Sequence, residues 1–175
     1  MEEPTGFVDL AWEGPFRIGH LLSDAVLRSK FNTSGVYLWI ETLPGPHCGK
    51  VSYIGKATGR PTITQRHLQH FVSCIGAQNQ VPEWARSSRV RWECHPERPE
   101  VASVLFNRGR LLELVGEAYD YVVSFDIYAA VIAQDLSIVE RNLIWDLRPV
   151  DNTSGTKTPP PIAVHLRHSN AKWLS

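Results

Sequence analysis

The chain has 175 residues, of which 43% are hydrophobic and 21% are charged, and this ordinary usage fits one folded domain over 1–175 and excludes wholesale disorder. Eighteen basic residues balance eighteen acidic ones, so no net charge draws the chain to a nucleic acid or another polyanion. No apolar run approaches the ~20 residues of a membrane span, and the start at Met1 lacks the basic and apolar regions of a secretory signal, so we expect a cytoplasmic protein with no membrane partner.

The first half of the chain predicts a helix, a β-hairpin and a second helix. In chain order these are a helix over 19–31, strands over 35–41 and 50–55, and a helix over 62–75. The two strand segments are rich in β-branched and aromatic residues, and Pro44-Gly45-Pro46 between them favours a turn. In the second helix, Ile63, Leu68 and Phe71 have the spacing of an inward face.

The second half predicts two further strands and two further helices. These are strands over 90–94 and 121–132 and helices over 99–118 and 136–147. Pro149 ends the last helix, and a polar, proline-rich loop over 151–161 begins a C-terminal arm over about 153–175. The pattern therefore predicts an α+β fold, in which a small antiparallel sheet, made of the hairpin and at least one further strand, is flanked by helices.

The cysteines argue against a structural metal or a disulfide framework. Cys48, Cys74 and Cys94 are odd in number and far apart in the chain. They form no Cys-x-x-Cys pair, and reduced thiols of this kind are typical of a cytosolic protein.

The basic residues are unevenly distributed along this neutral chain. Segment 42–82 holds four Lys or Arg residues and no acid, and segment 152–175 holds three and no acid. Together these stretches would give one basic face to a neutral body, although runs of this kind also arise by chance or for solubility.

The predicted hairpin carries Gly35-Val36-Tyr37 on its first strand and Tyr53-Ile54-Gly55 on its second. Three polar residues follow in later elements: Arg66, Glu140 and Asn152. This ordered set, with core motifs over 35–152, resembles the GIY-YIG nucleases, whose fold is a small antiparallel sheet flanked by helices. The resemblance implies metal-dependent hydrolysis of DNA phosphodiester bonds.

The second predicted helix points to one branch of that family. It carries Arg66 and, four residues later, His70, a spacing that puts both on one helix face and resembles the restriction endonucleases. The gap between Tyr53 and Arg66 is longer than in the excision-repair incision enzymes, which leaves Arg60 as an alternative to Arg66. Residues about 71–120 form an insertion relative to the family.

The spacing of the hairpin predicts how its tyrosines are arranged. A turn centred on Gly45 pairs Tyr37 with Tyr53, because opposed residues of an antiparallel pair have a constant sum of residue numbers. Both phenols are then expected on one face, whereas a slip of one residue sends them to opposite faces. Without the motif, both would be read as half-buried aromatic residues of the sheet.

Phosphodiester hydrolysis needs an activated water and compensation of the charge that develops on the phosphate. The resemblance implies Tyr37 as the general base, with Tyr53 and His70 in the network that orients it. Because a phenol is a weak base at neutral pH, we expect the neighbouring cations Lys56, Arg66 and His70 to favour the phenolate. Arg66 is expected to clamp a phosphate, since a guanidinium stays charged and offers a planar fork of donors.

Glu140 matches the metal ligand of the family. The resemblance implies one Mg²⁺, for which Mn²⁺ is expected to substitute, held by this single carboxylate and completed by waters and a phosphate oxygen. The local alternative is a capping box, because Ser137-x-x-Glu140 has the required spacing. Asn152 would bond a phosphate oxygen or orient active-site groups, and as a loop residue it could equally form a turn.

The expected partner is double-stranded DNA, read by the insertion, the arm or loops beside the site. Candidate DNA-binding residues are Lys50, Arg60, Arg86, Arg89, Arg91, Lys157, Arg167 and Lys172. One active site cuts one strand, so a restriction-type cut of both strands implies a homodimer on a palindromic sequence.

Three alternatives to a restriction enzyme stay open at this stage. The first is a repair or mobile-element nuclease that nicks DNA as a monomer. The second is a catalytically inactive nucleic-acid-binding module with the same fold, which would be expected to lose Glu140 or Arg66 first. The third, a small-molecule hydrolase, has no Gly-x-Ser-x-Gly motif to support it.

Overall fold

The computed structural model describes residues 6–75, 119–120, 122–133, 135–152 and 155–174. These residues form β1 (Phe7–Ala11), β2 (Glu13–Phe16), α1 (Ile18–Ser23), α2 (Ala25–Lys30), β3 (Gly35–Ile40), β4 (Val51–Ala57), α3 (Ile63–Ile75), β5 (Asp126–Val131), α7 (Leu136–Leu147), β6 (His165–Ser169) and a 3₁₀ turn (Lys172–Leu174). Most of the insertion expected over about 71–120 lies outside the described residues. The same is true of the strand expected over 90–94, the helix expected over 99–118, and Arg86, Arg89 and Arg91.

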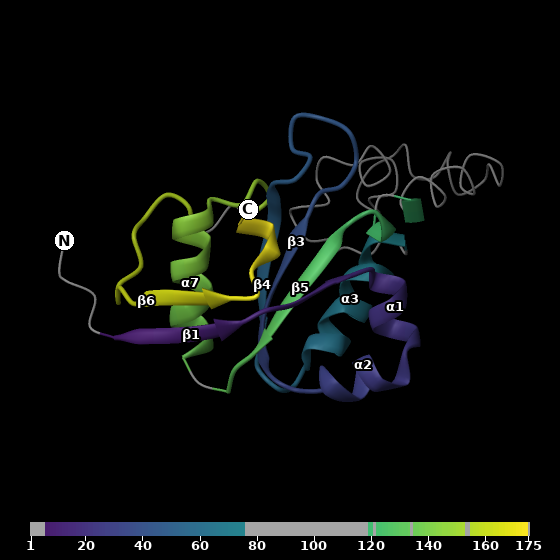
Figure 1. Ribbon diagram of the computed structural model, residues 1–175, viewed down its shortest axis with the longest axis horizontal. Helices are drawn as coiled ribbons and strands as arrows, with labels where there is room; N and C mark the ends of the chain where they lie inside the picture. The colour runs from purple at the N-terminus through teal and green to yellow at the C-terminus, as the bar shows by residue number, and fades with distance from the viewer. Residues whose placement is uncertain (1–5, 76–118, 121, 134, 153–154, 175) are drawn as a thin grey trace, which may run out of the picture.

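Four strands form an antiparallel sheet in the order β2-β5-β3-β4, which confirms the α+β fold class. All six residues of β3 are buried, as expected for a central strand covered on both faces. Helices α1, α2 and α3 cover one face of the sheet, and α7 covers the other (Figure 1). None of the helices in the described part of the chain is long and apolar enough to cross a membrane.

The two faces of β3 contribute to two different cores, because successive side chains of a strand point to opposite sides. Tyr37 and Trp39 pack into the core under α1, α2 and α3. Val36 and Leu38 pack with Leu143 in the core under α7. Strand β3 therefore gives two large aromatic rings to the α3 side of the sheet and two aliphatic side chains to the α7 side.

The hairpin and the helices expected over 62–75 and 136–147 are confirmed within a residue or two at each end. The helix expected over 19–31 is instead two short helices. Asp24 separates them, because its carboxylate accepts hydrogen bonds from the backbone N–H groups of Val26 (2.8 Å) and Leu27 (2.9 Å) and so caps α2. The strand expected over 121–132 begins only at Asp126, and helical residues precede it.

The segment expected as a C-terminal arm is part of the fold. After the proline-rich loop the chain forms β6, which pairs in parallel with β1 from Phe7↔His165 to Ala11↔Ser169 (Figure 1). Trp12 then donates a hydrogen bond of 2.9 Å to His168 Nδ1. Strands β1, β2 and β6 were not predicted, because each is short and finds its partner far away in the sequence.

Candidate active site

Tyr37 and Tyr53 lie on the same face of the hairpin, but they are not direct partners. Tyr37 is opposite Gly55, and Trp39 is opposite Tyr53. The expected pairing of the two tyrosines is therefore wrong by two residues, a shift that leaves both phenols on one face because strand side chains alternate with a period of two. Their ring centroids are 6.2 Å apart, and the rings are tilted by 44°.

Gly55 makes this register possible because it has no side chain. A Cβ atom built at Gly55 would lie 2.5 Å from both Cζ and Oη of Tyr37, which is closer than real Cβ contacts come. The phenol of Tyr37 therefore lies across the backbone of β4 at the one position where the strand leaves room for it. The glycine is required for packing here, not for an unusual backbone conformation.

Helix α3 places an imidazole against the Tyr37 hydroxyl. Thr62 and Gln65 start this helix with a capping box, in which Gln65 N donates to Thr62 Oγ1 (3.3 Å) and Thr62 N donates to Gln65 Oε1 (3.0 Å). Two turns later, His70 Nε2 lies 2.8 Å from Tyr37 Oη, and both side chains are buried.

A second histidine, His67, supports the first and was not predicted. Its Nδ1 lies 2.8 Å from the carbonyl oxygen of Ile63 and must donate to it, so its Nε2 is free to accept the 3.2 Å hydrogen bond from Trp39 Nε1. The His67 ring also packs on Tyr37 at 4.5 Å between centroids.

The inward face of α3 is the expected one in part: Ile63 is fully buried and Phe71 packs against the core, but Leu68 does not face inward. Leu68 is 49% exposed, whereas His67 is fully buried and His70 is 4% exposed. The helical spacing of Ile63, His67 and His70 is the signal that could have identified this face, since residues three and four apart share one side of a helix. The prediction missed this face because histidines are polar and are not expected to line a core.

Burial keeps both partners of the buried hydrogen bond neutral. Loss of solvation, followed by the charge of a Tyr53 phenolate, raises the pKa of Tyr37 well above its usual value, although the Arg66 guanidinium acts to lower it. Burial lowers the pKa of His70 well below its usual value, with smaller contributions from His67 and Arg66. At neutral pH the phenol therefore donates to the imidazole, because a neutral phenol is the stronger acid of the two.

The expectation that neighbouring cations favour the Tyr37 phenolate is thus not met in this state of the protein. Of the three cations proposed, Arg66 alone lowers the pKa of Tyr37, and desolvation outweighs it. His70 is uncharged at neutral pH because it is buried, and Lys56 pairs with a carboxylate elsewhere. The loss of solvation of the phenolate therefore determines the direction in which the pKa of Tyr37 shifts.

Arg66, and not Arg60, acts on the tyrosines. Its charge lowers the pKa of Tyr37 and of Tyr53, although burial leaves both raised. One guanidinium nitrogen also donates to Gln69 at 3.1 Å. Arg60 lines a surface pocket of about 630 Å³, whose other lining residues are Asn32, Gly59, Pro61, Thr62, Gln65 and Gln69.

Glu140 and Ser137 converge on the ammonium group of Lys56. The Lys56 nitrogen lies 2.7 Å from a carboxylate oxygen of Glu140 and 3.0 Å from the Ser137 hydroxyl oxygen, to which it donates. The capping-box alternative for Glu140 is wrong, because α7 has Asp135 at its N-cap and Ser137 lies inside the first turn. The charge of Glu140 also raises the pKa of Tyr37 and Tyr53, so the carboxylate acts on both phenols.

The donor set at Glu140 fits a hard cation. A carboxylate oxygen and a hydroxyl oxygen already face one cationic group, and oxygen is the ligand type that Mg²⁺ prefers. No cluster of three or more His, Cys, Asp or Glu residues occurs among the residues described. A Mg²⁺ ion here would therefore depend on one protein carboxylate, with waters and a substrate oxygen as its remaining ligands.

Asn152 holds the outer edge of β4. Its amide nitrogen donates to the carbonyl of Ile54 (2.9 Å), and its amide oxygen accepts from the N–H of the same residue (2.8 Å). The backbone N–H of Asp151 donates to the carbonyl of Ser52 in the same way (2.8 Å). Asn152 thus orients the strand that carries Tyr53 and Lys56, which agrees with the orienting role among those expected for it.

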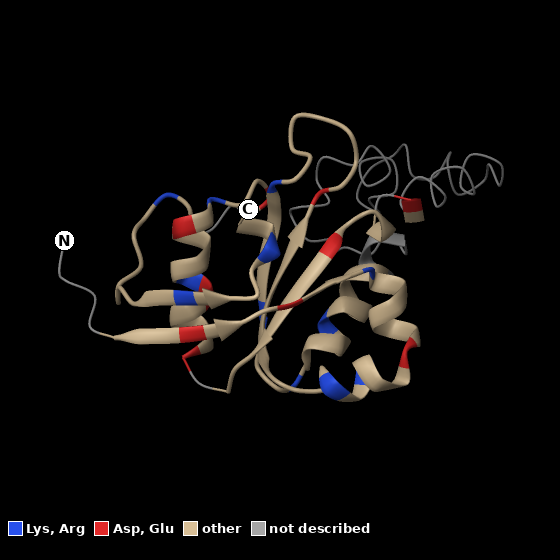
Figure 2. Ribbon diagram, viewed as in Figure 1, with Lys and Arg blue, Asp and Glu red and all other residues tan. Residues whose placement is uncertain are grey.

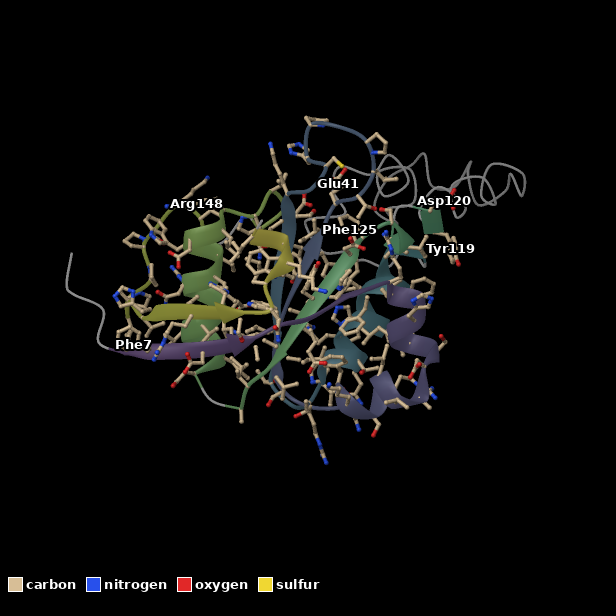
Figure 3. The ribbon with its side chains drawn as sticks, in the orientation of Figure 1. Phe7, Glu41, Tyr119, Asp120, Phe125 and Arg148 are labelled. Carbon is tan, nitrogen blue, oxygen red and sulfur yellow. The ribbon has the colours of Figure 1, made fainter. Side chains whose placement is uncertain are left out.

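Asp151, beside this contact, is a second group that burial perturbs. Desolvation raises its pKa to about 6, against the hydrogen bond from Ser52, and the charge of Glu41 adds to the rise. Glu41 directly follows β3, at the start of the hairpin loop (Figure 3).

Among the residues that the structure describes, basic residues of the two acid-free segments have acidic neighbours from elsewhere in the chain. Arg167 pairs with Asp9 at 3.1 Å across the β1–β6 sheet, and Lys56 pairs with Glu140. Lys50, Lys157 and Lys172 are exposed. Figure 2 shows Lys and Arg interspersed with Asp and Glu over α7, β1 and β6. Segments free of acids in the sequence therefore meet acids from other segments once the chain is folded.

The described residues thus assemble a buried phenol–imidazole pair, an arginine that acts on two phenols, and an acidic oxygen site on the other side of β4. Such an arrangement can move a proton, compensate an anion and hold a hard cation. Comparisons of this chain with models of protein families, with curated proteins and with solved structures found no match.

Proposed function

We propose that this protein is an endonuclease of the GIY-YIG type that hydrolyses DNA phosphodiester bonds, most like a sequence-specific restriction enzyme. The observation that carries the proposal is the 2.8 Å contact between Tyr37 Oη and His70 Nε2, beside Arg66 and within reach of the Glu140 charge. These residues come from β3, α3 and α7. Their residue types are those that the motif resemblance requires.

The phenol–imidazole pair offers a route for the proton of the attacking water. As the water oxygen forms its bond to phosphorus, the water proton passes to Tyr37 Oη, and the proton of Tyr37 passes to His70 Nε2 along the existing hydrogen bond. No free phenolate is needed beforehand, which agrees with the raised pKa of Tyr37. The phosphorus bond to the leaving oxygen breaks, and that oxygen takes a proton from solvent. His70 then gives the proton it accepted back to solvent, which restores the neutral pair.

Arg66 compensates the charge on the phosphate, since its guanidinium remains ionised and acts on both phenols. Glu140, with Ser137 beside it, would hold the Mg²⁺ ion. When bound, the ion supplies further compensation of negative charge at the phosphate.

The rival function is a nucleic-acid-binding module without catalysis. A binding surface gains nothing from a neutral, buried hydrogen bond between a phenol and an imidazole, because phosphates are bound by exposed cations. The buried pair therefore favours hydrolysis over binding alone.

The test is cleavage of supercoiled plasmid DNA with Mg²⁺ by the full chain and by Glu140→Gln. Cleavage is expected with the wild-type protein and is expected to be lost in the variant, while binding to a DNA duplex in the absence of metal is retained. Glu13→Gln is the matched control, since Glu13 lies on β2 and pairs with Lys30 of α2, not with Lys56.

Each outcome of this assay separates the candidate functions. Linear product from one binding event supports a homodimer, and nicked product supports a monomer. Wild-type protein that binds DNA but leaves the plasmid intact would favour the binding module. Cleavage by Glu140→Gln at the wild-type rate would remove Glu140 as the metal ligand.

A further inference from the structure

We propose that Lys56 is a built-in competitor of the catalytic metal, which must displace its ammonium group from Glu140 before the site becomes active. This inference rests on the proposed function, because it concerns the regulation of the same site. It assigns to Lys56 a role different from that of a cation that lowers the pKa of a phenol.

The contacts of Lys56 are those of a cation in an oxygen site. The ammonium lies 2.7 Å from Glu140 and 3.0 Å from Ser137, with one contact on each of two successive turns at the start of α7. The side chains of Lys56 and Glu140 are 30% and 21% exposed, so the pair is partly withdrawn from water but open to exchange with ions.

Strand alternation explains why the ammonium reaches this position. Residues 53 and 55 of β4 face the α3 side, so Lys56 faces the opposite side, where α7 packs. Asn152 fixes the backbone of Ile54, two residues before Lys56. The base of the lysine side chain is thus held in place by the strand.

The ammonium and a divalent ion cannot share these oxygens closely. Two cations a few ångströms apart repel each other, and this site has one carboxylate to offset both. Arrival of the metal therefore frees Lys56. Its long side chain, anchored on the strand that carries Tyr53, can then turn towards a substrate phosphate.

The apparent metal affinity depends on the fraction of molecules in which the Glu140 and Ser137 oxygens are not occupied by Lys56. If Lys56 occupies them in most molecules, the apparent Kd exceeds the intrinsic one by the reciprocal of the free fraction. From the stability of partly exposed ion pairs, removing the ammonium should tighten metal binding by ~2- to 6-fold.

The experiment measures Mn²⁺ binding to the full chain without DNA, by the loss of the electron paramagnetic resonance signal of free Mn²⁺. Lys56→Met is compared with the wild type and with Lys50→Met, which removes the same charge from an exposed position on the same hairpin. Lys56→Met is expected to bind more tightly, whereas Lys50→Met should stay within ~2-fold of the wild type because exposed charges are screened.

A second measurement uses the wild-type protein and needs no variant to fold. Limited acetylation followed by mass spectrometry reports the reactivity of the Lys56 amine, with Lys50 as the internal reference. Mg²⁺ is expected to raise acetylation of Lys56 relative to Lys50, and the rise should be absent in Glu140→Gln.

Failure of this inference differs from failure of the proposed function. Equal or weaker binding by Lys56→Met than by Lys50→Met, with binding abolished in Glu140→Gln, would overturn the competitor role and leave Glu140 as the metal ligand. Wild-type Mn²⁺ affinity in Glu140→Gln would overturn both. Acetylation of Lys56 that Mg²⁺ does not change would also overturn the displacement.

Discussion

The two sides of strand β4 hold their polar groups in opposite ways. On the α3 side, Tyr37 and His70 are buried, neutral and joined by a hydrogen bond. On the α7 side, Lys56 and Glu140 are charged and partly exposed to solvent. Desolvation suppresses charge on the first side, while water and counter-charge sustain it on the second.

This difference assigns different tasks to the two sides. A buried neutral pair holds its geometry and passes a proton, because no ion or water competes for the hydrogen bond. A partly exposed ion pair exchanges partners easily, since such pairs are worth little in water. On the α3 side, Gly55 lets the Tyr37 phenol reach the backbone of β4.

The largest expected effect comes from removing the proton carrier on the α3 side. Tyr37→Phe should slow cleavage by ~10²- to 10⁴-fold, the range for loss of a positioned base. The buried His70 loses one partner, which should lower the free energy of unfolding by only about 1–3 kcal/mol. Single-turnover cleavage and urea denaturation measure the two effects separately.

Tyr128→Phe is the matched control for this change, because Tyr128 is a buried strand tyrosine of the α7-side core. It should leave the rate within a few-fold of the wild type. The wild-type rate should also be flat through neutral pH, since neither Tyr37 nor His70 titrates there. Near-normal cleavage by Tyr37→Phe would move activation of the water to another group, with His70 first.

The second prediction concerns the neutral state of the α3 side. Burial lowers the pKa of His67 from 6.5 to about 4, so the unfolded chain binds the proton more tightly than the folded protein does. The contribution of His67 to stability is therefore complete above pH 6.5 and is lost as the pH falls towards 4, by about 3 kcal/mol in all.

His67→Gln tests this prediction because glutamine keeps a donor and an acceptor but does not titrate. The stability difference between wild type and variant, from urea denaturation at each pH, should shrink as the pH falls from 6.5 to 4. The raised pKa of Asp151 gives the opposite slope in part of this range, but it is common to both proteins. A difference that is constant with pH would contradict the buried, neutral state of His67.

The third prediction fills the space beside Gly55 that the Tyr37 ring occupies. Gly55→Ala places a methyl group 2.5 Å from the Tyr37 hydroxyl, so the ring must move, at a cost of about 1–3 kcal/mol in the free energy of unfolding. Cleavage should fall as well, because Tyr37 shifts relative to His70. Thermal denaturation and cleavage rates check both effects.

Gly45→Ala is the control for Gly55→Ala, since an added Cβ at Gly45 meets nothing within 4 Å. It should change stability by less than about 0.5 kcal/mol. Equal behaviour of the two variants would mean that the Tyr37 ring does not lie across β4.

The smallest expected effect distinguishes the two arginines of the segment. Arg66→Ala should lower the single-turnover rate about tenfold more than Arg60→Ala, which corresponds to the loss of one charge-assisted hydrogen bond at the site. The reason is that Arg66 acts on both phenols, whereas Arg60 lines a surface pocket next to Thr62 and Gln69. The reverse ranking would place the phosphate clamp at Arg60.

Local sequence was sufficient for the elements that carry the site. The β-branched hairpin, the helix with Arg66 and His70, and the last helix all follow from periodicity and turn residues. That Tyr37 and Tyr53 share one face also followed, because any even shift of register preserves it. These features depend on neighbours within a few residues.

Features that depend on distant neighbours could only be decided by the tertiary structure. The partners of β1, β2 and β6 lie far away in the chain, so no local pattern identified these strands. The register of the hairpin depends on the space above Gly55, and the engagement of Asn152 depends on a strand that precedes it by almost 100 residues.

The electrostatic state of the site was likewise decided by folding. The sequence by itself supplied Tyr37, His70, Lys56 and Glu140 as a set of candidates, and from it the phenol was expected to ionise. Burial reverses that expectation for Tyr37, because solvation of a charge is a property of the whole surrounding structure. Packing of α7 on the other side of β4 gives Lys56 its carboxylate partner, Glu140. Lys56 was expected beside the Tyr37 phenol, and this tertiary contact places its ammonium group in the cation site instead.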